Sequence, residues 1–433
     1  MKNQILNKDK KYIWHPFTQL KISKPPIVVK SAKNENIYDI DGNEYVDLIS
    51  SWWVNTHGHS RKEIIEKIYE QTKMIEQVLF AGFTHRPAVE LAERLAALLP
   101  RKINKVFFSD NGSTSVEIAM KVAIQYWHNK GKKSKQKFMA FKGGYHGDTF
   151  GAMSVGFSSG FYEPFKDLVN DSFFFDFPEN WSGNNQIEEC EKQSLDQAQQ
   201  IIKKNKEQIA AVILEPLIQG AGGMKMCRPI YLDKLLRMFR DAGIIIIFDE
   251  VMTGFGRTGK MFALNHLKEY PDIVCLAKSL TGGYIPLAAT IFDEKIHDEF
   301  VNNDFKKTFL HGHTFTANPV ACSAALASLD LYDKDKTFEK IKSINKIHKV
   351  CMLELSKHCK ISKVRILGSI AAFDFNEINA KYGSHDGEKL KSIFLNNGLL
   401  LRPIGNTIYL MPPFCIKKST LLKCYEKLNE ILQ

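Results

Sequence analysis

The stretches Gly243-Ile-Ile-Ile-Ile-Phe-Asp249 and Asp272-Ile-Val-Cys-Leu-Ala-Lys278 decide the fold. Each has the length and the β-branched content of a strand that is buried on both faces, as in a parallel sheet. Each also delivers a charged side chain, Asp249 or Lys278, to the end of its strand, where open α/β sheets bind their ligands. Two interpretations of these charges stay open at this point: a ligand site, or a buried ion pair or two solvated strand ends.

The size and the charge of the chain limit the classes of protein to consider. Its 433 residues exceed one typical domain and predict two domains with a large core. A formal net charge of +11 raises the question of nucleic acid. However, the basic residues are spread along the chain, without a zinc-finger, RRM or basic-region pattern. We therefore expect no nucleic-acid partner, and we interpret the charge as a solubility feature, with phosphate or carboxylate ligands second.

The cysteines and the N-terminus indicate the compartment. The eight cysteines show neither a CxxC nor a Cys/His metal spacing, so no metal site is expected and a reducing cytoplasm suits them. The N-terminal residues lack the apolar segment of a signal peptide. No stretch approaches the ~20 apolar residues that a membrane span needs. These features predict a cytoplasmic protein without a membrane partner.

Strand-like and helical runs alternate from Lys105 to about Leu329, after a mostly helical stretch, Arg61–Leu99, that breaks near Ala81–Pro87. The alternation predicts a large domain with a mostly parallel sheet and helices on both faces. The predicted strands are Val106–Ser109, Lys137–Phe141, Ala210–Glu215, Ile244–Asp249 and Ile273–Ala277.

The two ends of the chain predict a smaller α/β domain. Near the N-terminus, Ile37–Leu48 is typical of a hairpin that turns at Asp41-Gly42-Asn43. After residue 330 we expect a long amphipathic helix, Lys334–Cys359, and the strands Val364–Ile370 and Thr407–Met411. The predicted boundaries are 1–60 for an arm and part of the small domain, 61–329 for the large domain, and 330–433 for the rest of the small domain.

The segment Ser109-Asp-Asn-Gly-Ser-Thr-Ser-Val-Glu-Ile-Ala-Met120 predicts a strand end followed by a helix start. The exposed N–H groups around Gly112 and Ser113, with the hydroxyl of Thr114, have the character of a phosphate cradle. The alternative is an ordinary N-cap with a helix behind it.

Two more turns follow predicted strands. In Phe141-Lys-Gly-Gly-Tyr-His-Gly-Asp-Thr149, paired glycines place Tyr145 and His146 on a tight turn. The tyrosine there either stacks on a flat heteroaromatic ring or covers the edge of the core. In Leu214-Glu-Pro-Leu-Ile-Gln-Gly-Ala-Gly-Gly223, Glu215 precedes a glycine-rich loop that lacks a nucleotide fingerprint. This carboxylate either tunes a cofactor ring or is a structural ion-pair partner.

Pyridoxal phosphate is the cofactor that suits these features, because it needs a lysine for its Schiff base and an acidic partner for its ring nitrogen. Over essentially its full length, the chain resembles the fold-type I, class III pyridoxal-phosphate aminotransferases. The motifs that carry the resemblance are Phe248-Asp-Glu-Val-Met-Thr-Gly-Phe-Gly-Arg-Thr-Gly259 and Leu276-Ala-Lys-Ser-Leu-Thr-Gly-Gly-Tyr-Ile-Pro-Leu287. The resemblance implies an α/β fold: a large domain with a mostly parallel, seven-stranded sheet, plus a smaller α/β domain built from both chain ends.

Within that class, four segments resemble the members that move an amino group from S-adenosylmethionine to 8-amino-7-oxononanoate in biotin biosynthesis. The segments are Trp14–Thr18, Ser50–Trp53, Tyr145–Ser154 and Arg402–Pro413. The implied reaction is a two-step exchange that yields 7,8-diaminononanoate. Lysine as the amino donor, or another ω-amino-acid aminotransferase acting on ornithine or 4-aminobutyrate, stays open. The joint presence of Asp249, Lys278 and the phosphate cradle argues against a non-catalytic binding protein on the same fold.

The resemblance also implies roles at the cofactor. Lys278 would hold the cofactor and then shuttle a proton, and Asp249 would keep the ring nitrogen protonated. Gly112 and Ser113 would bind the phosphate. Thr314 would reach the same phosphate from the partner subunit, which implies an obligate homodimer with shared active sites. Further cofactor candidates are Tyr145, Glu215 and His313.

For the substrates, the resemblance places Trp52 and Trp53 at the pocket, where a flat indole suits an adenine ring or a sulfonium cation. In a strand these neighbours would face opposite sides, so one of them is expected to be structural. Arg402 would pair with the carboxylate of the acceptor. Members of the class commonly carry tyrosine where this chain has Phe17, so a hydroxyl bond to substrate or to Asp148 is lost while an aromatic wall remains. The other pocket candidates are Tyr145, Gly312, Tyr409 and Arg257. For Arg257 the alternative is a loop arginine that caps a helix.

Overall fold

The large sheet has seven strands, as expected. The computed structural model describes residues 1–156, 162–169, 171–378 and 385–432. The strand order is β4 (Ile103–Ser109), β12 (Ala288–Asp293), β11 (Ile273–Leu276), β10 (Ile245–Asp249), β7 (Ile209–Leu214), β5 (Lys137–Phe141) and β6 (Ser172–Phe175). Their pairings are parallel except for the two that β12 makes, with β11 and β4. The predicted mostly parallel sheet is confirmed.

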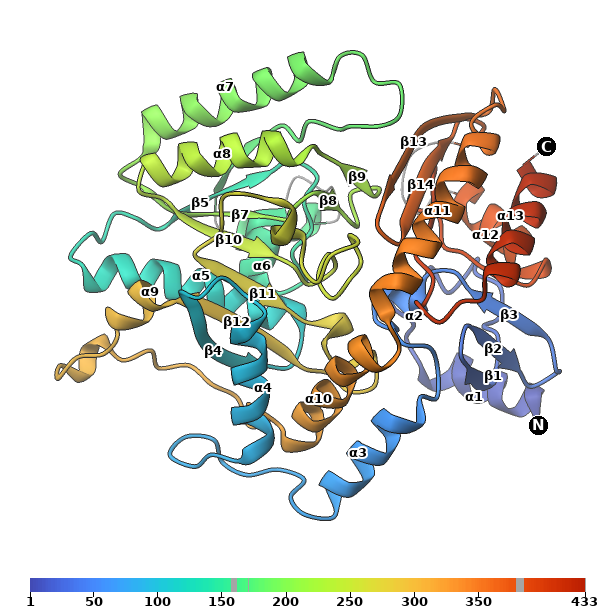
Figure 1. Cartoon of the computed structure of the whole chain (residues 1–433), viewed down its shortest axis with the longest axis horizontal. Helices are drawn as coiled ribbons and strands as arrows, with labels where there is room; N and C mark the ends of the chain where they lie inside the picture. The colour runs from blue at the N-terminus through green and yellow to red at the C-terminus, as the bar shows by residue number, and fades with distance from the viewer. Residues whose placement is uncertain (157–161, 170, 379–384, 433) are drawn as a thin grey trace.

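Helices cover both faces of this sheet (Figure 1). Ile245 and Ile247 of β10 share a core with α5 (Gly112–Asn129). Ile246 and Phe248 face the opposite core, which includes α7 (Ile187–Asn205) and α8 (Pro229–Asp241). Successive side chains of a strand point to opposite faces, so β10 is buried on both sides and its charged residue lies at its end.

The two chain ends meet in a smaller unit at the right of Figure 1. Strands β1 (Val29–Lys33), β2 (Asn36–Asp39) and β3 (Glu44–Asp47) form a sheet with β15 (Leu399–Leu400). A second sheet consists of β13 (Ile361–Leu367), β14 (Ile370–Phe375) and β16 (Thr407–Leu410). The antiparallel β2–β3 pair confirms the predicted N-terminal hairpin. Helices α11 (Thr337–Leu355), α12 (His385–Asn396) and α13 (Lys418–Leu432) belong to this unit.

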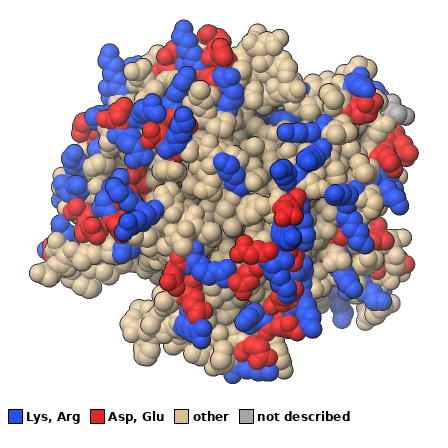
Figure 2. All heavy atoms as spheres, viewed as in Figure 1, with Lys and Arg blue, Asp and Glu red and all other residues tan. Residues whose placement is uncertain are grey.

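The chain contains further α-helices and two short strands. They are α1 (Lys2–Tyr12), α2 (Ser50–Trp53), α3 (Lys62–Thr72), α4 (Arg86–Ala97), α6 (Phe150–Gly156), α9 (Glu294–Asp298), α10 (Pro319–Lys334), β8 (Ile218–Gln219) and β9 (Lys225–Met226). On the face that Figure 2 shows, basic and acidic side chains are interspersed. Among the described residues, no helix combines the length and apolarity that a bilayer crossing requires.

Two predictions in the C-terminal part are wrong in detail. The helix expected at Lys334–Cys359 begins only at Thr337, because α10 ends at Lys334 and Lys336 has a left-handed φ of 50°. The strand expected at Val364–Ile370 is instead a hairpin that turns at Gly368, with φ +60°. A Cβ at Gly368 would lie 2.3 Å from the backbone of residues 257–259, so the turn requires glycine.

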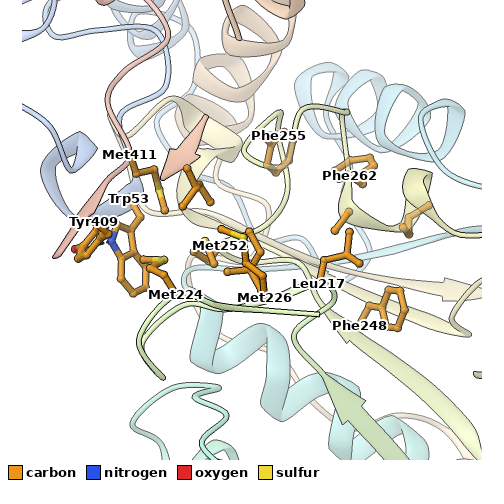
Figure 3. Packing of buried hydrophobic residues seen from close by; sticks show 14 of the residues in the cluster. Trp53, Leu217, Met224, Met226, Phe248, Met252, Phe255, Phe262, Tyr409 and Met411 are labelled. Atoms are coloured by element: carbon orange, nitrogen blue, oxygen red, sulfur yellow. Dashed lines mark hydrogen bonds between the residues drawn. The ribbon is translucent and has the colours of Figure 1, made fainter. Parts of the chain in front are cut away.

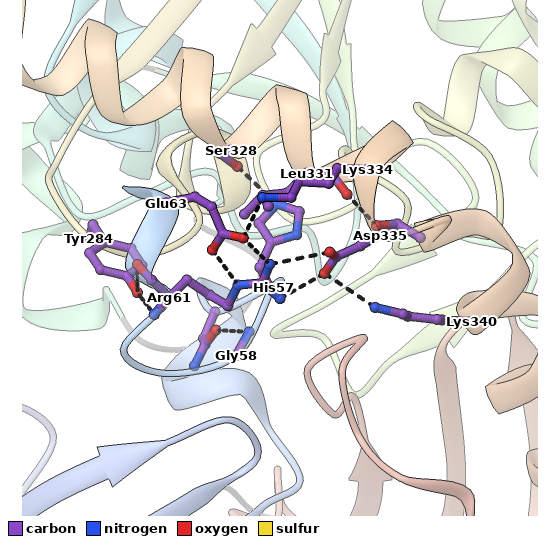
Figure 4. A network of polar contacts seen from close by, with 12 residues as sticks. His57, Gly58, Arg61, Glu63, Tyr284, Ser328, Leu331, Lys334, Asp335 and Lys340 are labelled. Atoms are coloured by element: carbon purple, nitrogen blue, oxygen red, sulfur yellow. Dashed lines mark hydrogen bonds and ion pairs between the residues drawn. The ribbon is translucent and has the colours of Figure 1, made fainter. Parts of the chain in front are cut away.

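A network of ion pairs ties the start of α3 to the connection between α10 and α11 (Figure 4). Arg61 bonds Asp335 at 2.7 Å and Glu63 at 3.2 Å. Lys334 bonds Glu63 at 2.9 Å, and Lys340 bonds Asp335 at 3.2 Å. The hydrogen bond from Lys334 is the main cause that lowers the pKa of Glu63 to about 2.

The Glu63→Gln variant should therefore melt at a lower temperature than the wild type at pH 7. A carboxyl whose pKa is lowered by folding contributes stability above its unfolded pKa of ~4.3, and this contribution is lost as pH falls toward the folded pKa. The difference in melting temperature should shrink as pH falls from about 5 to 3. Glu66→Gln, at an exposed pair with Lys62, is the control and should differ little from the wild type. A difference that is constant over this pH range would contradict the prediction.

Candidate active site

A cavity of about 590 Å³ opens at the carboxyl edge of the large sheet. Its walls include residues from the segments that follow β4, β5, β7, β10 and β11, at the edge where open α/β sheets bind ligands. The N-terminal arm and the small unit close the other side. The predicted site residues that line it are Phe17, Trp52, Trp53, Gly112, Ser113, Tyr145, Glu215, Asp249, Lys278, Arg402 and Tyr409.

Asp249 and Lys278 line the same cavity, and among the described ion pairs none joins them. The carboxylate of Asp249 lies at the end of β10, where Oδ2 is 2.7 Å from Nδ1 of His146. Its Oδ1 accepts from the backbone N–H of Val251 at 3.1 Å. These contacts hold the carboxylate in one orientation, and the ion-pair interpretation of the two strand ends is wrong.

The amine of Lys278 has a different environment. Its Nζ lies 4.8 Å from the centroid of the Trp53 ring, and within the described part of the chain it has no hydrogen-bond partner. Burial is the largest influence on its pKa and lowers it, while the charges of Asp249 and Glu215 act in the opposite direction. A lysine with a lowered pKa is more often a neutral amine, the form that can act as a nucleophile or a base.

The start of α5 forms the predicted cradle. Asn111 caps the helix by accepting from the N–H of Thr114 at 3.0 Å, and the Thr114 hydroxyl completes a capping box. Thr114 is thus occupied by the cap, whereas Gly112 and Ser113 face the cavity. A Cβ at Gly112 would lie 2.7 Å from Val251, so a side chain at that position has no room. The segment is both an N-cap and an open helix start suited to an anion.

Glu215 is held by the backbone and not by a cation. Its Oε1 accepts from the N–H of Tyr145 at 3.0 Å, and its Oε2 accepts from the N–H of Gly220 at 2.9 Å. No described ion pair includes it, so the structural ion-pair alternative is wrong. Burial is the largest influence on this carboxyl and raises its pKa to about 7. Glu215 therefore sets the position of the turn that carries Tyr145.

Trp52 and Trp53 lie in α2, a tight turn, and the expectation of a strand is wrong. Residues 50–53 all have left-handed φ values, between 49° and 93°. This geometry turns both indoles toward the cavity. Trp53 donates from Nε1 to the Tyr409 hydroxyl at 3.0 Å, and its ring packs over the methionine-rich core shown in Figure 3.

Arg257 holds this turn from behind. Its fully buried guanidinium donates to Ser50 Oγ and to the backbone oxygens of Trp53, Asn55 and Pro412, at 3.2 to 3.3 Å. Burial lowers its pKa to about 10. Arg257 is absent from the described lining of the cavity, so its interpretation as a pocket residue is wrong. The helix-capping alternative is the one that the contacts favour, because the guanidinium binds the backbone oxygen of Trp53, the last residue of α2. Arg257 also fastens α2 and the segment after β16 to the loop after β10.

The outer wall of the cavity is aromatic and cationic. The guanidinium of Arg402 lies 4.5 Å from the centroid of the Trp52 ring. The ring of Phe17 also packs against Trp52, with a centroid distance of 5.7 Å and an interplanar angle of 70°. This arrangement offers a flat apolar surface beside a planar cation.

Gly312, His313 and Thr314 are not brought to this cavity. They lie in a segment between β12 and α10, and Thr314 is exposed. Gln77 donates to the backbone oxygen of Thr314 at 2.7 Å, which ties this segment to the one between α3 and α4. Sequence reasoning also left His146 without a role. Its place one residue after Tyr145, on a turn at the cavity edge, is the signal that could have identified it.

The fold and the site together define a class of protein. Residues 19–432 match the family described as aminotransferase class-III, and the chain belongs to this family. Members of this class depend on pyridoxal 5′-phosphate.

Individual relatives match along nearly their whole length. The adenosylmethionine-8-amino-7-oxononanoate aminotransferase of Synechococcus elongatus is 44% identical over 421 residues, which is 97% of this chain and 98% of the relative. The crystal structure of the enzyme of that name from Methanocaldococcus jannaschii has a TM-score of 0.92 and 38% identity, and it covers 100% of this chain and 99% of its own. An amine transaminase from an uncultivated Pseudomonas species, in a PLP-bound form, has a TM-score of 0.90, 30% identity, and coverage of 97% and 98%.

The residues at the cavity fit this cofactor. Lys278 offers an amine without a competing hydrogen bond among the described residues, and Asp249 presents an oriented carboxylate. Gly112 and Ser113 at the start of α5 line the cavity, and the N-terminus of this helix suits a phosphate. Lys278 suits the aldehyde of the cofactor, Asp249 suits its ring nitrogen, and the start of α5 suits its phosphate.

The Lys278→Ala variant should lose the yellow colour that we expect of wild type reconstituted with pyridoxal phosphate, because the covalent link to the lysine would be absent. Borohydride reduction followed by peptide mass spectrometry should add the cofactor mass to the peptide that contains Lys278 in the wild type alone. Lys260→Ala is the control, since Lys260 is exposed and bonds the backbone of Asn265. Labelling of a different lysine in the wild type would overturn the assignment.

Proposed function

We propose that this protein moves an amino group from S-adenosylmethionine to 8-amino-7-oxononanoate, giving 7,8-diaminononanoate for biotin biosynthesis. The observation that carries the proposal is the amine of Lys278, which has no hydrogen-bond partner among the described residues, in one cavity with the oriented carboxylate of Asp249. The substrates are supported by the names of the full-length relatives from Synechococcus elongatus and Methanocaldococcus jannaschii. Lysine, ornithine or 4-aminobutyrate as donor are the competing outcomes of the test below.

Three groups of the chain would hold the cofactor: Lys278 by its amine, Asp249 at the ring nitrogen, and Gly112 with Ser113 at the phosphate. When bound, the cofactor supplies an electron-withdrawing ring beside the carbon that loses or gains the amine. Asp249 would keep a proton on the ring nitrogen, and His146 would keep the carboxylate aimed at it. Tyr145, half-buried on the same wall, would cover one face of the ring.

Lys278 would also move a proton at the substrate carbon. Burial favours the neutral form of its amine, which is the form that accepts a proton. The adjacent Trp53 ring removes water from one side of the amine. A proton taken from the donor can then be returned to the acceptor by the same side chain.

The outer wall would select the substrates. The carboxylate of the oxononanoate would pair with Arg402, whose planar guanidinium suits two oxygens at once. Trp52 and Phe17 would receive the flat or cationic part of the donor. Trp53 and Tyr409 hold each other by a hydrogen bond and would form the inner wall. Phe17 contributes a ring without a hydroxyl.

A second copy of the chain would complete the site. Large apolar side chains are exposed on the two tied segments before α4 and before α10: Met74, Leu79, Phe83, Leu310 and Phe315. A shared apolar patch of this kind marks an interface. In a homodimer, Gly312, His313 and Thr314 of one subunit would reach the cavity of the other, with Thr314 at the phosphate.

The amino donor can be identified from single half-reactions. We expect S-adenosylmethionine to discharge the visible absorbance of the holoenzyme, and 8-amino-7-oxononanoate added afterwards to restore it. Lysine, ornithine and 4-aminobutyrate are tested in parallel. Discharge by ornithine or 4-aminobutyrate, with no response to S-adenosylmethionine, would refute the proposal, and discharge by lysine alone would replace the donor while keeping the acceptor.

The Asp249→Asn variant should bind the cofactor but convert it ~10²–10⁴ times more slowly, the usual range for losing a proton-transfer group. An amide cannot keep a proton on the ring nitrogen. Stopped-flow absorbance measures the conversion, and cofactor content is measured separately. Asp272→Asn is the control, because Asp272 is buried at the start of β11 and away from the described cavity wall. Wild-type rates in Asp249→Asn would remove Asp249 from this role.

A further inference from the structure

Tyr162 lies directly behind the turn that carries Tyr145. Its side chain is buried, with 4% of the residue exposed. The hydroxyl is 3.1 Å from the backbone oxygen of Gly147 and 3.3 Å from Oδ1 of Asp148. Tyr162 is outside the described wall of the cavity, so any effect on substrate passes through the residues that it contacts.

Asp148 connects the two tyrosines. Its Oδ2 accepts from the Tyr145 hydroxyl at 2.9 Å, while its Oδ1 faces the Tyr162 hydroxyl. Its backbone N–H donates to Ser113 Oγ at 3.3 Å. With both carboxylate oxygens held, the plane of the carboxylate is defined, and so is the direction in which the Tyr145 hydroxyl points.

The space around this turn is tightly filled. A Cβ at Gly147, which has φ +124°, would lie 2.1 Å from Ser113 Oγ. A Cβ at Gly156, the last residue of α6, would lie 3.2 Å from the Gly144 oxygen and 3.5 Å from the ring of Tyr162. The turn therefore packs between Ser113 and the segment that carries Tyr162, and its exact position depends on both.

We propose that Tyr162 is a positioning residue for the amino transfer: through Asp148 and Gly147 it sets the hydroxyl of Tyr145 at the substrate cavity. The inference rests on the proposed function, because it takes Tyr145 as a group that meets the substrate. Phe17, which also lines the cavity, has no hydroxyl to share this task. Burial and the charge of Asp148 raise the pKa of both tyrosine hydroxyls, so both are protonated donors at neutral pH.

A double-mutant cycle tests the proposal with the holoenzyme. The variants are Tyr162→Phe, Tyr145→Phe and the two together, and each half-reaction is followed by the visible absorbance of the cofactor. We expect Tyr162→Phe to lower kcat/KM about tenfold, in the same half-reaction that Tyr145→Phe impairs, as for loss of a hydrogen bond to a charged group. In the Tyr145→Phe background the further loss should be less than about twofold, because the group being positioned is already absent.

Tyr231→Phe is the matched control. Tyr231 is also buried, and its hydroxyl is 2.6 Å from Ser194 Oγ, away from the described cavity wall. It should lower the melting temperature and leave both half-reactions unchanged. If Tyr162→Phe behaves like this control, or if the two losses multiply in the double variant, the positioning role is wrong. If the wild type responds to neither proposed substrate, the proposed function fails, and the cycle is run with whichever amine does react.

Discussion

The burial of β10 and β11 on both faces is the constraint on which the site depends. A charged side chain cannot lie within such a strand without a partner, so charges are confined to the strand ends. Asp249 is the last residue of β10, and Lys278 follows β11 by two residues. Because these strands are neighbours and parallel, both charges emerge at one edge of the sheet. The same burial then acts on their chemistry, since it disfavours the charged form of Lys278 and leaves Asp249 to be stabilised by His146 and a backbone N–H.

A second constraint comes from a buried cation. Four consecutive residues in left-handed conformation cost roughly 1–2 kcal/mol each, so α2 needs support from its surroundings. Arg257 supplies it through four hydrogen bonds, and the ring of Phe414, 5.0 Å away, covers the guanidinium. No carboxylate pairs with it among the described residues, so the energy of burying this charge is offset by neutral acceptors. The turn that presents Trp52 and Trp53 is thus coupled to the loop after Asp249, and the two walls of the cavity are built together.

The sequence predicted well those features that depend on local pattern. The continuous apolar runs identified the buried strands, and the glycine-hydroxyl segment identified the start of α5. Features that depend on contacts between residues far apart in the chain could not be predicted from the sequence. The left-handed turn at Ser50–Trp53 contains no glycine and is held by Arg257, some 200 positions along the chain. The hairpin that turns at Gly368 has the local sequence pattern of one strand. Its turn requires glycine because the backbone near Arg257 leaves no space for a Cβ. The sequence left Glu215 open between tuning a cofactor ring and pairing with a cation, because its backbone partners depend on how the Tyr145 turn folds back.

The charges around the cavity show why the site needs its ligands. Glu215, at the cavity wall, and Glu250, outside its described lining, are buried, and each has its pKa raised to about 7, so both are only partly ionised at neutral pH. Each is held by backbone N–H groups, which stabilise the ionised form without adding a positive charge. The start of α5 and the guanidinium of Arg402 are positive features that line the cavity. A phosphate at the first and a substrate carboxylate at the second would add negative charge to the cavity that Lys278 lines. Binding at these points would favour the protonated form of the amine, whereas burial favours the neutral one. The balance between the two opposes a permanent charge on Lys278 and suits a group that must gain and lose a proton in every cycle.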